Sequence, residues 1–262
     1  MRFTKMEGLG NDYIYINCME GEPPDLPALA VQLSDRHFGV GGDGIICLKP
    51  GRIGDFSMEM YNADGSRGAM CGNGIRCLAK YVYDRRLTRK TCLTIDTDAG
   101  PKGVELSVSG GTADRVTVDM GEGLLFPSVV LEAGGESFSV WQVSMGNPHA
   151  VIFCPAPEQV DLERLGPVLE HHPELRERSN VEFAAAEGRN RLTVRVWERG
   201  SGITLACGTG ACACFAAARR AGLCGERAEI CLPGGVLELE AREKRIFMTG
   251  PARTVFEGEI EL

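Results

Sequence analysis

Cys71-Gly72-Asn73-Gly74-Ile75-Arg76-Cys77 contains a cysteine and glycine pattern that Cys207-Gly208-Thr209-Gly210-Ala211-Cys212 repeats. After the first stretch, apolar residues recur at helical spacing. After the second, residues 211–218 are apolar on every side, which predicts a buried helix. Each leading cysteine therefore directly precedes a helix. Unpaired backbone N–H groups and the positive end of the helix dipole gather there, and this position can lower the pKa of a thiol.

The two stretches belong to an internal repeat, since Cys207 follows Cys71 by 136 residues. The same offset relates further polar or glycine positions: Gly10-Asn11 to Gly146-Asn147, Gly44 to Asn180, and Asn62 to Glu198. A repeat of about half the chain predicts two similar α/β domains related by a pseudo-two-fold axis. In this α+β arrangement, each domain is a curved, mostly antiparallel sheet wrapped around a central helix. We expect the corresponding loops to face one cleft, with the two cysteines on opposite walls.

The predicted domains are residues 1–119, which carry Cys71, and residues 120–251, which carry Cys207. A final strand in residues 252–262 returns to the first domain. Besides the two cysteine helices, helices are predicted over residues 26–36 and 162–170. Strands are predicted over residues 3–6, 13–17, 45–48, 56–62, 93–97, 103–108, 115–119, 138–144, 150–153, 180–184, 190–198, 228–232, 236–241, 245–248 and 255–260. The alternation in residues 56–62 predicts a half-buried strand.

Composition and charge limit the class of protein. Of 262 residues, 44% are apolar and 24% are charged, which is typical of a globular chain with a substantial core. A net charge of −8 argues against nucleic acid as a partner, because phosphate binding needs a basic face. No apolar run approaches the ~20 residues that span a bilayer, and the first residues lack the apolar region of a signal peptide. We therefore expect a cytoplasmic protein with no membrane partner.

The chain has eleven cysteines, and this odd number without a secretion signal predicts reduced thiols. Single cysteines in strand-like apolar segments are expected to be small buried hydrophobes: Cys18, Cys47, Cys92, Cys154 and Cys231. No C-x-x-C pair occurs. We therefore predict that the protein has no zinc or other metal site.

Two opposed thiols suit the inversion of a carbon stereocentre. A thiolate can take a proton from one face of the carbon while a thiol returns a proton to the other face, without metal or pyridoxal cofactor. Backbone N–H groups at the two helix starts could bind the α-carboxylate and support the carbanionic transition state. The sequence therefore favours cofactor-independent acid–base chemistry at Cys71 and Cys207.

The motifs together resemble the diaminopimelate epimerase family across essentially the whole chain. The resemblance rests on Lys5-Met6-x-Gly8-x-Gly10-Asn11-Asp12, Asn62-Ala63-Asp64-Gly65-Ser66, Met70 to Cys77, Gly146-Asn147-Pro148-His149, Ser179 to Phe183, and Glu198 to Gly210. It implies epimerisation of LL-2,6-diaminopimelate to the meso form without a cofactor, within lysine and peptidoglycan precursor synthesis. It also implies a homodimer.

The resemblance assigns roles to individual residues. Cys71 and Cys207 match the catalytic acid/base cysteines, and His149 and Glu198 match the pair that tunes them. Glu198 also belongs to the set that matches substrate-binding positions, with Asn11, Asn62, Gly72, Asn73, Asn147, Asn180, Arg199, Gly208 and Thr209. Two positions depart from the family pattern: Glu7 stands where many members have His, and Gly44 where some have a substrate-contacting Gln.

Alternatives remain open at this point. The chain could be a proline racemase-like or other amino-acid epimerase, for which the pocket should be smaller and more apolar than one with Arg199 as a distal carboxylate clamp. It could also be a non-catalytic binding or thiol redox protein. For the asparagines, turn chemistry is the structural alternative, because Asn tolerates the left-handed region and bonds its own backbone. For Arg199, the alternative is a surface ion pair.

Overall fold

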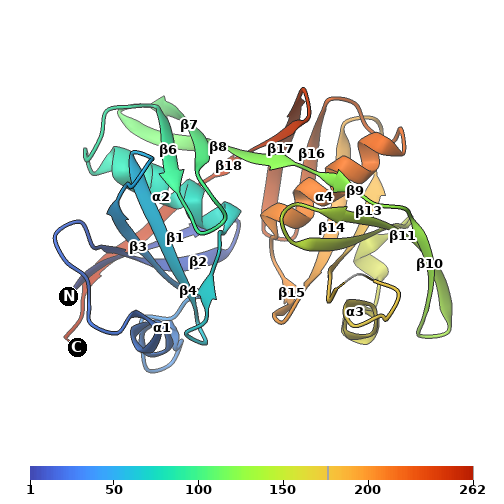
Figure 1. Cartoon of the computed structure of the whole chain (residues 1–262), viewed down its shortest axis with the longest axis horizontal. Coiled ribbons are helices and arrows are strands. Elements are labelled where there is room, and N and C mark those ends of the chain that lie inside the picture. Colours follow the sequence, from blue (N-terminus) through green and yellow to red (C-terminus); the bar gives the residue numbers. More distant parts are fainter. Residues whose placement is uncertain (176, 262) are drawn as a thin grey trace. The chain divides into compact units, whose positions relative to one another are not determined.

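The computed structural model describes residues 1–175 and 177–261. Contacts divide the chain into two compact units, and each has the sheet-dominated α/β fold that the sequence predicts (Figure 1). The first unit is Met1–Val118 together with the segment that starts at Gly250, and the second is Asp119–Thr249. Among the described helices, none has the length and apolar character needed to cross a membrane.

The first unit contains a mostly antiparallel sheet with two helices. Its elements are β1 (Arg2–Gly8), β2 (Asn11–Asn17), α1 (Leu26–Ser34), β3 (Gly44–Pro50), β4 (Phe56–Asn62), β5 (Arg67–Gly68), α2 (Gly72–Asp84), β6 (Cys92–Asp96), β7 (Lys102–Ser109), β8 (Thr112–Glu122) and β19 (Arg253–Glu259). β1 pairs antiparallel with both β19 and β2. The pairs β2–β3 and β4–β6 are parallel, whereas β3–β4, β6–β7 and β7–β8 are antiparallel.

The second unit has the same kind of sheet around α4. Its elements are β9 (Leu124–Leu125), β10 (Val129–Ala133), β11 (Glu136–Ser144), β12 (Pro148–Phe153), η1 (Pro157–Gln159), α3 (Leu162–Glu170), β13 (Asn180–Ala186), β14 (Arg191–Glu198), β15 (Gly202–Thr204), α4 (Gly208–Arg220), β16 (Arg227–Leu232), β17 (Gly235–Arg242) and β18 (Arg245–Pro251). Here the parallel pairs are β12–β13 and β14–β16.

The 136-residue repeat is visible in the helices. α1 and α3 each have nine residues, and α2 and α4 each have thirteen, and within both pairs the starting residues lie 136 positions apart. α2 packs against β1, β2 and β7, and α4 packs against β11, β12, β13, β14, β16 and β17. Each cysteine helix is therefore the central element of its own unit, as the periodicity of its apolar residues predicts.

Several sequence predictions need correction. The strand β4 is buried on both faces instead of one, because Tyr61 packs into the core beneath α1. Cys92 is exposed, since it begins β6 on the outward side, and Cys154 and Cys231 are only half-buried; Cys18 and Cys47 are buried as predicted. The helix predicted over residues 26–36 ends at Ser34. The short elements β5, β9, β10, β15 and η1 were not predicted, because two to five residues carry too little periodicity.

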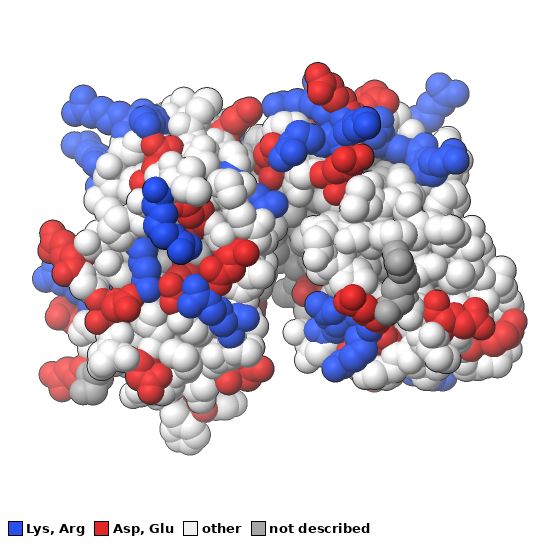
Figure 2. Space-filling view, viewed as in Figure 1, with Lys and Arg blue, Asp and Glu red and all other residues white. Residues whose placement is uncertain are grey.

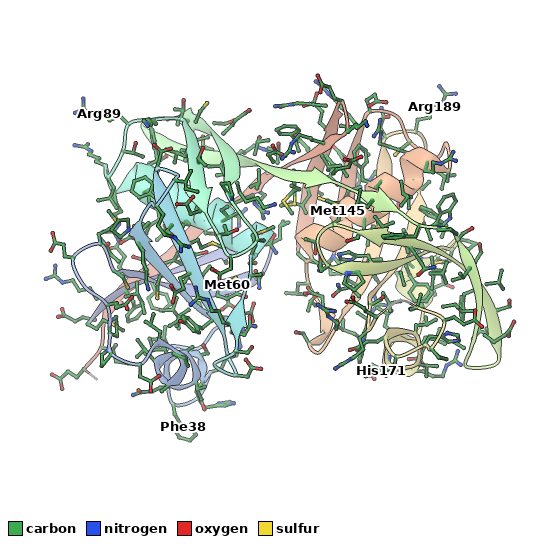
Figure 3. All side chains as sticks on the ribbon, in the orientation of Figure 1. Phe38, Met60, Arg89, Met145, His171 and Arg189 are labelled. Carbon is green, nitrogen blue, oxygen red and sulfur yellow. The ribbon has the colours of Figure 1, made fainter. Side chains whose placement is uncertain are left out.

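Charges of both signs are interspersed over the face of each unit shown in Figure 2, which leaves no continuous basic stripe on that face. Large apolar side chains are mostly internal, but Phe38 is 93% exposed and points away from the first unit (Figure 3).

Asp96 forms hydrogen bonds with the loop that precedes β4. These bonds should contribute to the stability of the folded protein, and this contribution should be lost in acid. The carboxylate of Asp96 accepts hydrogen bonds from the backbone N–H groups of Arg52 at 2.7 Å, Ile53 at 2.9 Å and Gly54 at 3.0 Å. These bonds, that of Ile53 foremost, hold the pKa of Asp96 below its ordinary value. The resulting stabilisation is present above the unfolded-state pKa and is lost as the pH falls through the lower folded-state pKa.

We therefore expect Asp96→Asn to lower the melting temperature at neutral pH and to flatten its decline below about pH 4. Thermal unfolding followed by circular dichroism across this range measures both effects. Asp114→Asn, at an exposed position of β8, is the control and should leave the profile unchanged. An unaltered acid slope in Asp96→Asn would contradict the role given to this carboxylate.

Candidate functional site

Cys71 is the N-cap residue of α2. Its extended backbone (φ −125°, ψ 119°) precedes the helix, and its Sγ accepts a hydrogen bond from the N–H of Gly74 at 3.3 Å. The thiol also donates to Oδ1 of Asn11 at 3.2 Å. A capping side chain satisfies one of the free N–H groups of the first turn. The sulfur is thus fixed at the positive end of the helix, in a half-buried position.

Asn11 is held in turn by a group that the sequence did not reveal. Its Nδ2 donates to Oδ2 of Asp43 at 2.7 Å, and the N–H of Asp12 donates to the same oxygen at 3.0 Å. Arg36 bridges Asp12 and Asp43, and the buried Lys5 pairs with Asp12 at 2.6 Å. The orientation of the Asn11 amide is therefore set by an ionic network. Burial raises the pKa of Asp43 above its ordinary value.

The two departures from the family pattern have structural explanations. Glu7 accepts a hydrogen bond from the N–H of Gly10 at 3.0 Å, so it closes the turn that presents Asn11. A Cβ at Gly44 would meet the backbone oxygen of Tyr61 at 2.1 Å, which leaves no room for a side chain. Position 44 therefore cannot supply a polar contact with this backbone.

The remaining predicted residues of the first unit lie at the same end of the sheet or in the first turn of α2. Asn62 ends β4 and donates from Nδ2 to Oγ of Ser66 at 3.0 Å, a contact typical of a turn. Gly72 and Asn73 form the first turn of α2, and both are buried. Asn73 is thus placed inside the unit.

Cys207 reproduces the geometry of Cys71 in the second unit. It is the N-cap of α4 (φ −118°, ψ 114°), and its Sγ accepts a hydrogen bond from the N–H of Gly210 at 3.4 Å. The hydroxyl of Thr209 lies 3.5 Å from the same sulfur. Both halves of the repeat therefore present a thiol at a helix N-terminus.

The surroundings of Cys207 reverse one prediction from the sequence. A helix N-terminus lowers the pKa of a thiol, but here burial raises the pKa of Cys207 well above its ordinary value, and the neighbouring carboxylates of Glu198 and Glu182 act in the same direction. The hydrogen bonds from Thr209 and Gly210 oppose this shift only in part. The surroundings of Cys207 therefore favour its protonated form over the thiolate.

His149 and Glu198 both lie in this cluster, but they are not paired with each other. Nδ1 of His149 is 2.7 Å from Oε1 of Glu182, and neither side chain is exposed. Glu198 instead accepts a hydrogen bond from the hydroxyl of Thr204 at 2.6 Å, and burial raises its pKa. Glu182 was missed as a site residue because it lies within the apolar strand β13, where only its charge among apolar neighbours signals a special role.

The other predicted site residues of the second unit form hydrogen bonds with the backbone or with one another. Oδ1 of Asn147 lies 3.1 Å from Nε2 of His149. Asn180 donates to the backbone oxygen of Pro148 at 2.9 Å and accepts from the N–H of Arg199 at 3.0 Å. The guanidinium of Arg199 donates to the backbone oxygen of Arg178 at 3.2 Å. Gly208 is buried in the first turn of α4.

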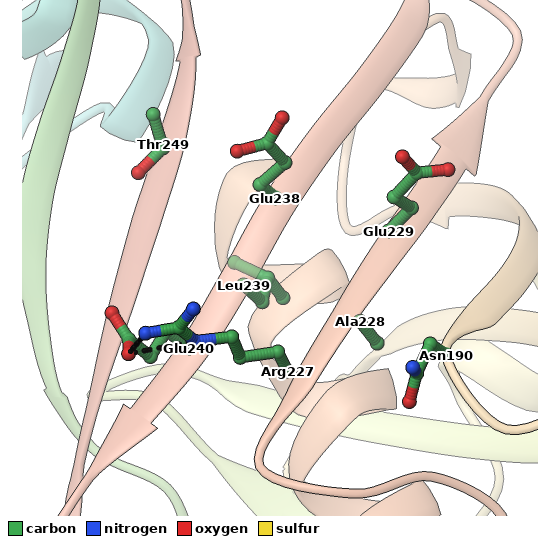
Figure 4. Close-up of a pocket in the computed structure, with 8 residues that line it drawn as sticks. All are labelled: Asn190, Arg227, Ala228, Glu229, Glu238, Leu239, Glu240 and Thr249. Atoms are coloured by element: carbon green, nitrogen blue, oxygen red, sulfur yellow. Dashed lines mark hydrogen bonds and ion pairs between the residues drawn. The ribbon is translucent and has the colours of Figure 1, made fainter.

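Two further observations bear on ligands. A surface hollow of about 340 Å³ lies over β16, β17 and β18, but its Arg227 is already paired with Glu240 (Figure 4). Within residues 1–175 and 177–261, no group of three or more His, Cys, Asp or Glu side chains could hold a metal ion. The cysteine-capped helix starts are therefore the better candidates for chemistry.

Comparison with known proteins shows full-length similarity. The diaminopimelate epimerase family model matches residues 3–125 and 141–255. The diaminopimelate epimerase of Acetivibrio thermocellus is 47% identical over 277 residues, which cover 100% of this chain and 99% of the relative. That of Leptospira biflexa is 44% identical, with 100% and 99% covered. A solved structure of a probable proline racemase from Agrobacterium radiobacter has 14% sequence identity and a TM-score of 0.76, covers 100% of this chain and 93% of its own, and so shares the fold.

Proposed function

Because this chain belongs to the diaminopimelate epimerase family, we propose that it interconverts LL- and meso-2,6-diaminopimelate with Cys71 and Cys207 as its acid and base. The enzyme is an isomerase of lysine biosynthesis. One observation carries the assignment of the two cysteines: each caps the central helix of its unit with its sulfur, at positions 136 residues apart. A cysteine that only packs in the core would not need to cap the central helix in both halves of the repeat.

In the proposed reaction, the thiolate of one cysteine removes the α-proton from one face of the carbon. The thiol of the other cysteine then delivers a proton to the opposite face, and the two exchange roles in the reverse direction. N–H groups of the first turns of α2 and α4 stabilise the substrate carboxylate as negative charge develops on the carbon. One cysteine gains a proton while the other loses one, so the reaction is balanced in protons and needs no cofactor.

The remaining residues have supporting roles in this proposal. His149 and Glu198 tune Cys207: Glu198 acts on the thiol directly, and His149 lies against Glu182, the other carboxylate that acts on it. Substrate contacts are assigned to the side chains of Asn11, Asn62, Asn73, Asn147, Asn180, Glu198, Arg199 and Thr209 and to the backbone at Gly72 and Gly208. Arg199 is the proposed clamp for the distal carboxylate, because a guanidinium matches that group with two parallel hydrogen bonds. We place the enzyme in the cytoplasm, in keeping with its eleven free thiols.

Incubation with LL-diaminopimelate in D₂O tests the function directly. Formation of the meso isomer, with one deuterium at the inverted carbon, is the expected result and can be followed by NMR and chiral chromatography. Exchange with proline or another amino acid, but not with diaminopimelate, would support a different epimerase. Failure to exchange any α-proton would leave only a binding or redox role for the thiols and would refute the proposal.

We also propose that the enzyme is a homodimer joined at β19. In the described residues β19 pairs only with β1, so its other edge is open. Val255 and Phe256 on this strand are 54% and 46% exposed. An open edge strand with exposed apolar side chains is a site for pairing with another chain.

We expect Phe256→Glu to convert the dimer to a monomer, because a desolvated carboxylate would oppose pairing. Light scattering after size-exclusion chromatography gives the mass directly. Val130→Glu, at a 63% exposed position of β10, is the matched control and should remain dimeric. A wild-type protein of monomer mass would disprove the dimer.

A further inference from the structure

Glu170, the last residue of α3, is a carboxylate buried at a place where negative charge is unfavourable. The residue is 3% exposed, and the C-terminal end of a helix already carries partial negative charge. Glutamate side chains are almost never fully buried unless they are paired. The carboxylate therefore needs partners that compensate for its position.

Three groups of the second unit donate hydrogen bonds to this carboxylate. Nε1 of Trp197 donates to Oε2 at 2.7 Å, Nε of Arg178 donates to Oε1 at 3.1 Å, and the backbone N–H of Gly200 donates to Oε1 at 3.2 Å. Each of these groups can only donate, so Glu170 accepts in all three bonds. Burial opposes ionisation, but the bonds from Trp197 and Arg178 prevail and hold the pKa of Glu170 below its ordinary value. Glu170 is therefore ionised at neutral pH.

These hydrogen bonds hold the segment that contains Arg199. Gly200 directly follows Arg199 in the sequence, and the backbone oxygen of Arg178 accepts a hydrogen bond from Nη1 of Arg199 at 3.2 Å. The backbone oxygen of Glu170 also accepts from the N–H of Ser179 at 3.2 Å. The end of α3 is thus joined both to the backbone beside Arg199 and to the residue that accepts a hydrogen bond from its guanidinium.

The internal repeat indicates that the fold does not require this carboxylate. The residue 136 positions before Glu170 is Ser34, which ends α1 and is also buried. The backbone contact persists there, because the backbone oxygen of Ser34 accepts from the N–H of Gly42 at 3.1 Å. The counterpart of Arg199 in the first unit is Ala63. The unit with alanine at this place ends its helix with serine, and the unit with arginine ends its helix with a carboxylate.

The side chain of Arg199 benefits from being held before a ligand binds. Two parallel hydrogen bonds to a carboxylate require one orientation of the guanidinium plane. A long side chain loses rotamer freedom when it is fixed, and fixing it in advance lowers the cost of binding. The bond to Arg178 involves Nη1, so the edge formed by Nε and Nη2 is not part of it.

We propose that Glu170 is a positioning residue for substrate binding: through Gly200 and Arg178 it holds the guanidinium of Arg199 in the orientation that binds the distal carboxylate. This inference rests on the proposed function, in which Arg199 clamps that group. The distal carboxylate keeps its charge throughout the reaction, so Arg199 contributes equally to the binding of the substrate and of the transition state. Loss of Glu170 should therefore raise KM and leave kcat nearly unchanged.

Glu170→Ser, which copies the first unit, tests the proposal in steady-state kinetics with LL-diaminopimelate. We expect KM to rise about fivefold, the cost of ordering one side chain on binding, and kcat to stay within about twofold of wild type. Asp96→Asn is the matched control, because it also alters a buried carboxylate that accepts backbone N–H groups of a loop. Its KM should equal that of wild type.

A double-mutant cycle with Arg199→Ala, which also copies the first unit, tests whether Glu170 acts through Arg199. Arg199→Ala alone should raise KM about 100-fold, because it removes two hydrogen bonds to a charged group. In this background Glu170→Ser should cause little further change, since the side chain that it positions is already absent. A fivefold rise in KM in both backgrounds would show that Glu170 acts independently of Arg199 and would overturn the inference.

Hydrogen exchange tests the contact without reference to turnover. In Glu170→Ser the amide of Gly200, followed by NMR, should exchange about fivefold faster, as for the loss of one hydrogen bond. The amide of Gly54, which donates to Asp96 at 3.0 Å in the first unit, is the internal control and should not change.

The outcomes separate this inference from the proposed function. A wild type that does not epimerise diaminopimelate would refute the proposed function, and the exchange of Gly200 would still decide whether Glu170 holds the segment that contains Arg199. With an active wild type, an unchanged KM in Glu170→Ser or an unchanged exchange rate at Gly200 would overturn the inference. If Glu170→Ser does not fold, Glu170→Gln keeps the volume of the side chain without its charge. Its Gly200 amide should exchange faster and its KM should rise, and wild-type values of both would overturn the inference.

Discussion

Replacement of either Cys71 or Cys207 by serine is expected to abolish epimerisation while the protein stays folded. Serine is a preferred N-cap residue, so the bond to the N–H of Gly74 or Gly210 persists and the stability should change by no more than about 1 kcal/mol. A serine hydroxyl is far less acidic than a thiol and cannot exchange protons with the α-carbon near neutral pH. Loss of general acid or base catalysis costs about 10²–10⁴ in rate.

Formation of the meso isomer from LL-diaminopimelate gives the rate, and thermal unfolding gives the stability, of the two single variants and the double variant. Cys212→Ser, in the buried part of α4 one turn further on, is the matched control for a cysteine without a proposed role. It should lose stability but keep activity. A serine variant at 71 or 207 with near wild-type turnover would exclude that cysteine as an acid or base.

Replacement of Arg76 by methionine is expected to destabilise the first unit. Arg76 is 0% exposed, and its guanidinium donates to the backbone oxygens of Pro251 at 3.1 Å and Gly72 at 3.2 Å. Hydrogen bonds from a charged donor contribute about 1.5–3 kcal/mol each. Methionine would fill the space but leave two buried carbonyl oxygens without these donors, so we expect a loss of about 3 kcal/mol.

Chemical denaturation with urea, followed by circular dichroism, measures this loss. Arg220→Met, at an exposed position near the end of α4, is the control and should change stability by less than about 0.5 kcal/mol. Arg76→Lys keeps the charge but cannot reach both oxygens, and it should be intermediate. If Arg76→Met is as stable as wild type, the hydrogen bonds from the guanidinium to the backbone at Pro251 and Gly72 do not stabilise the first unit.

The sequence was sufficient to predict what depends on periodicity. The apolar spacing after Cys71 and Cys207 located the two central helices, and the 136-residue offset between the motifs recurs in the starting residues of α1 and α3 and of α2 and α4. Family membership, full-length similarity and the α/β fold agree with what the motifs implied. The roles of the individual site residues stay predictions.

What the sequence could not supply depends on contacts between distant strands. Asp43 and Glu182 lie in a loop and an apolar strand, and only the fold brings Asp43 to Asn11 and Glu182 to His149. The pKa of Cys207 shows the same limit. Its place at a helix start favours a lower value, but the depth of burial and the approach of Glu198 are properties of the folded unit, and they prevail.

The return of the chain to its first unit has a consequence for synthesis on the ribosome. β1 pairs with β19 from Arg2 to Glu7, yet every residue of the second unit is translated between these two strands. The second unit is contiguous in sequence and can complete its sheet as soon as Thr249 has emerged. The first unit starts earlier but finishes later, so a nascent chain carries one unpaired edge of β1 until the last strand arrives, and this edge is where premature self-association is to be expected.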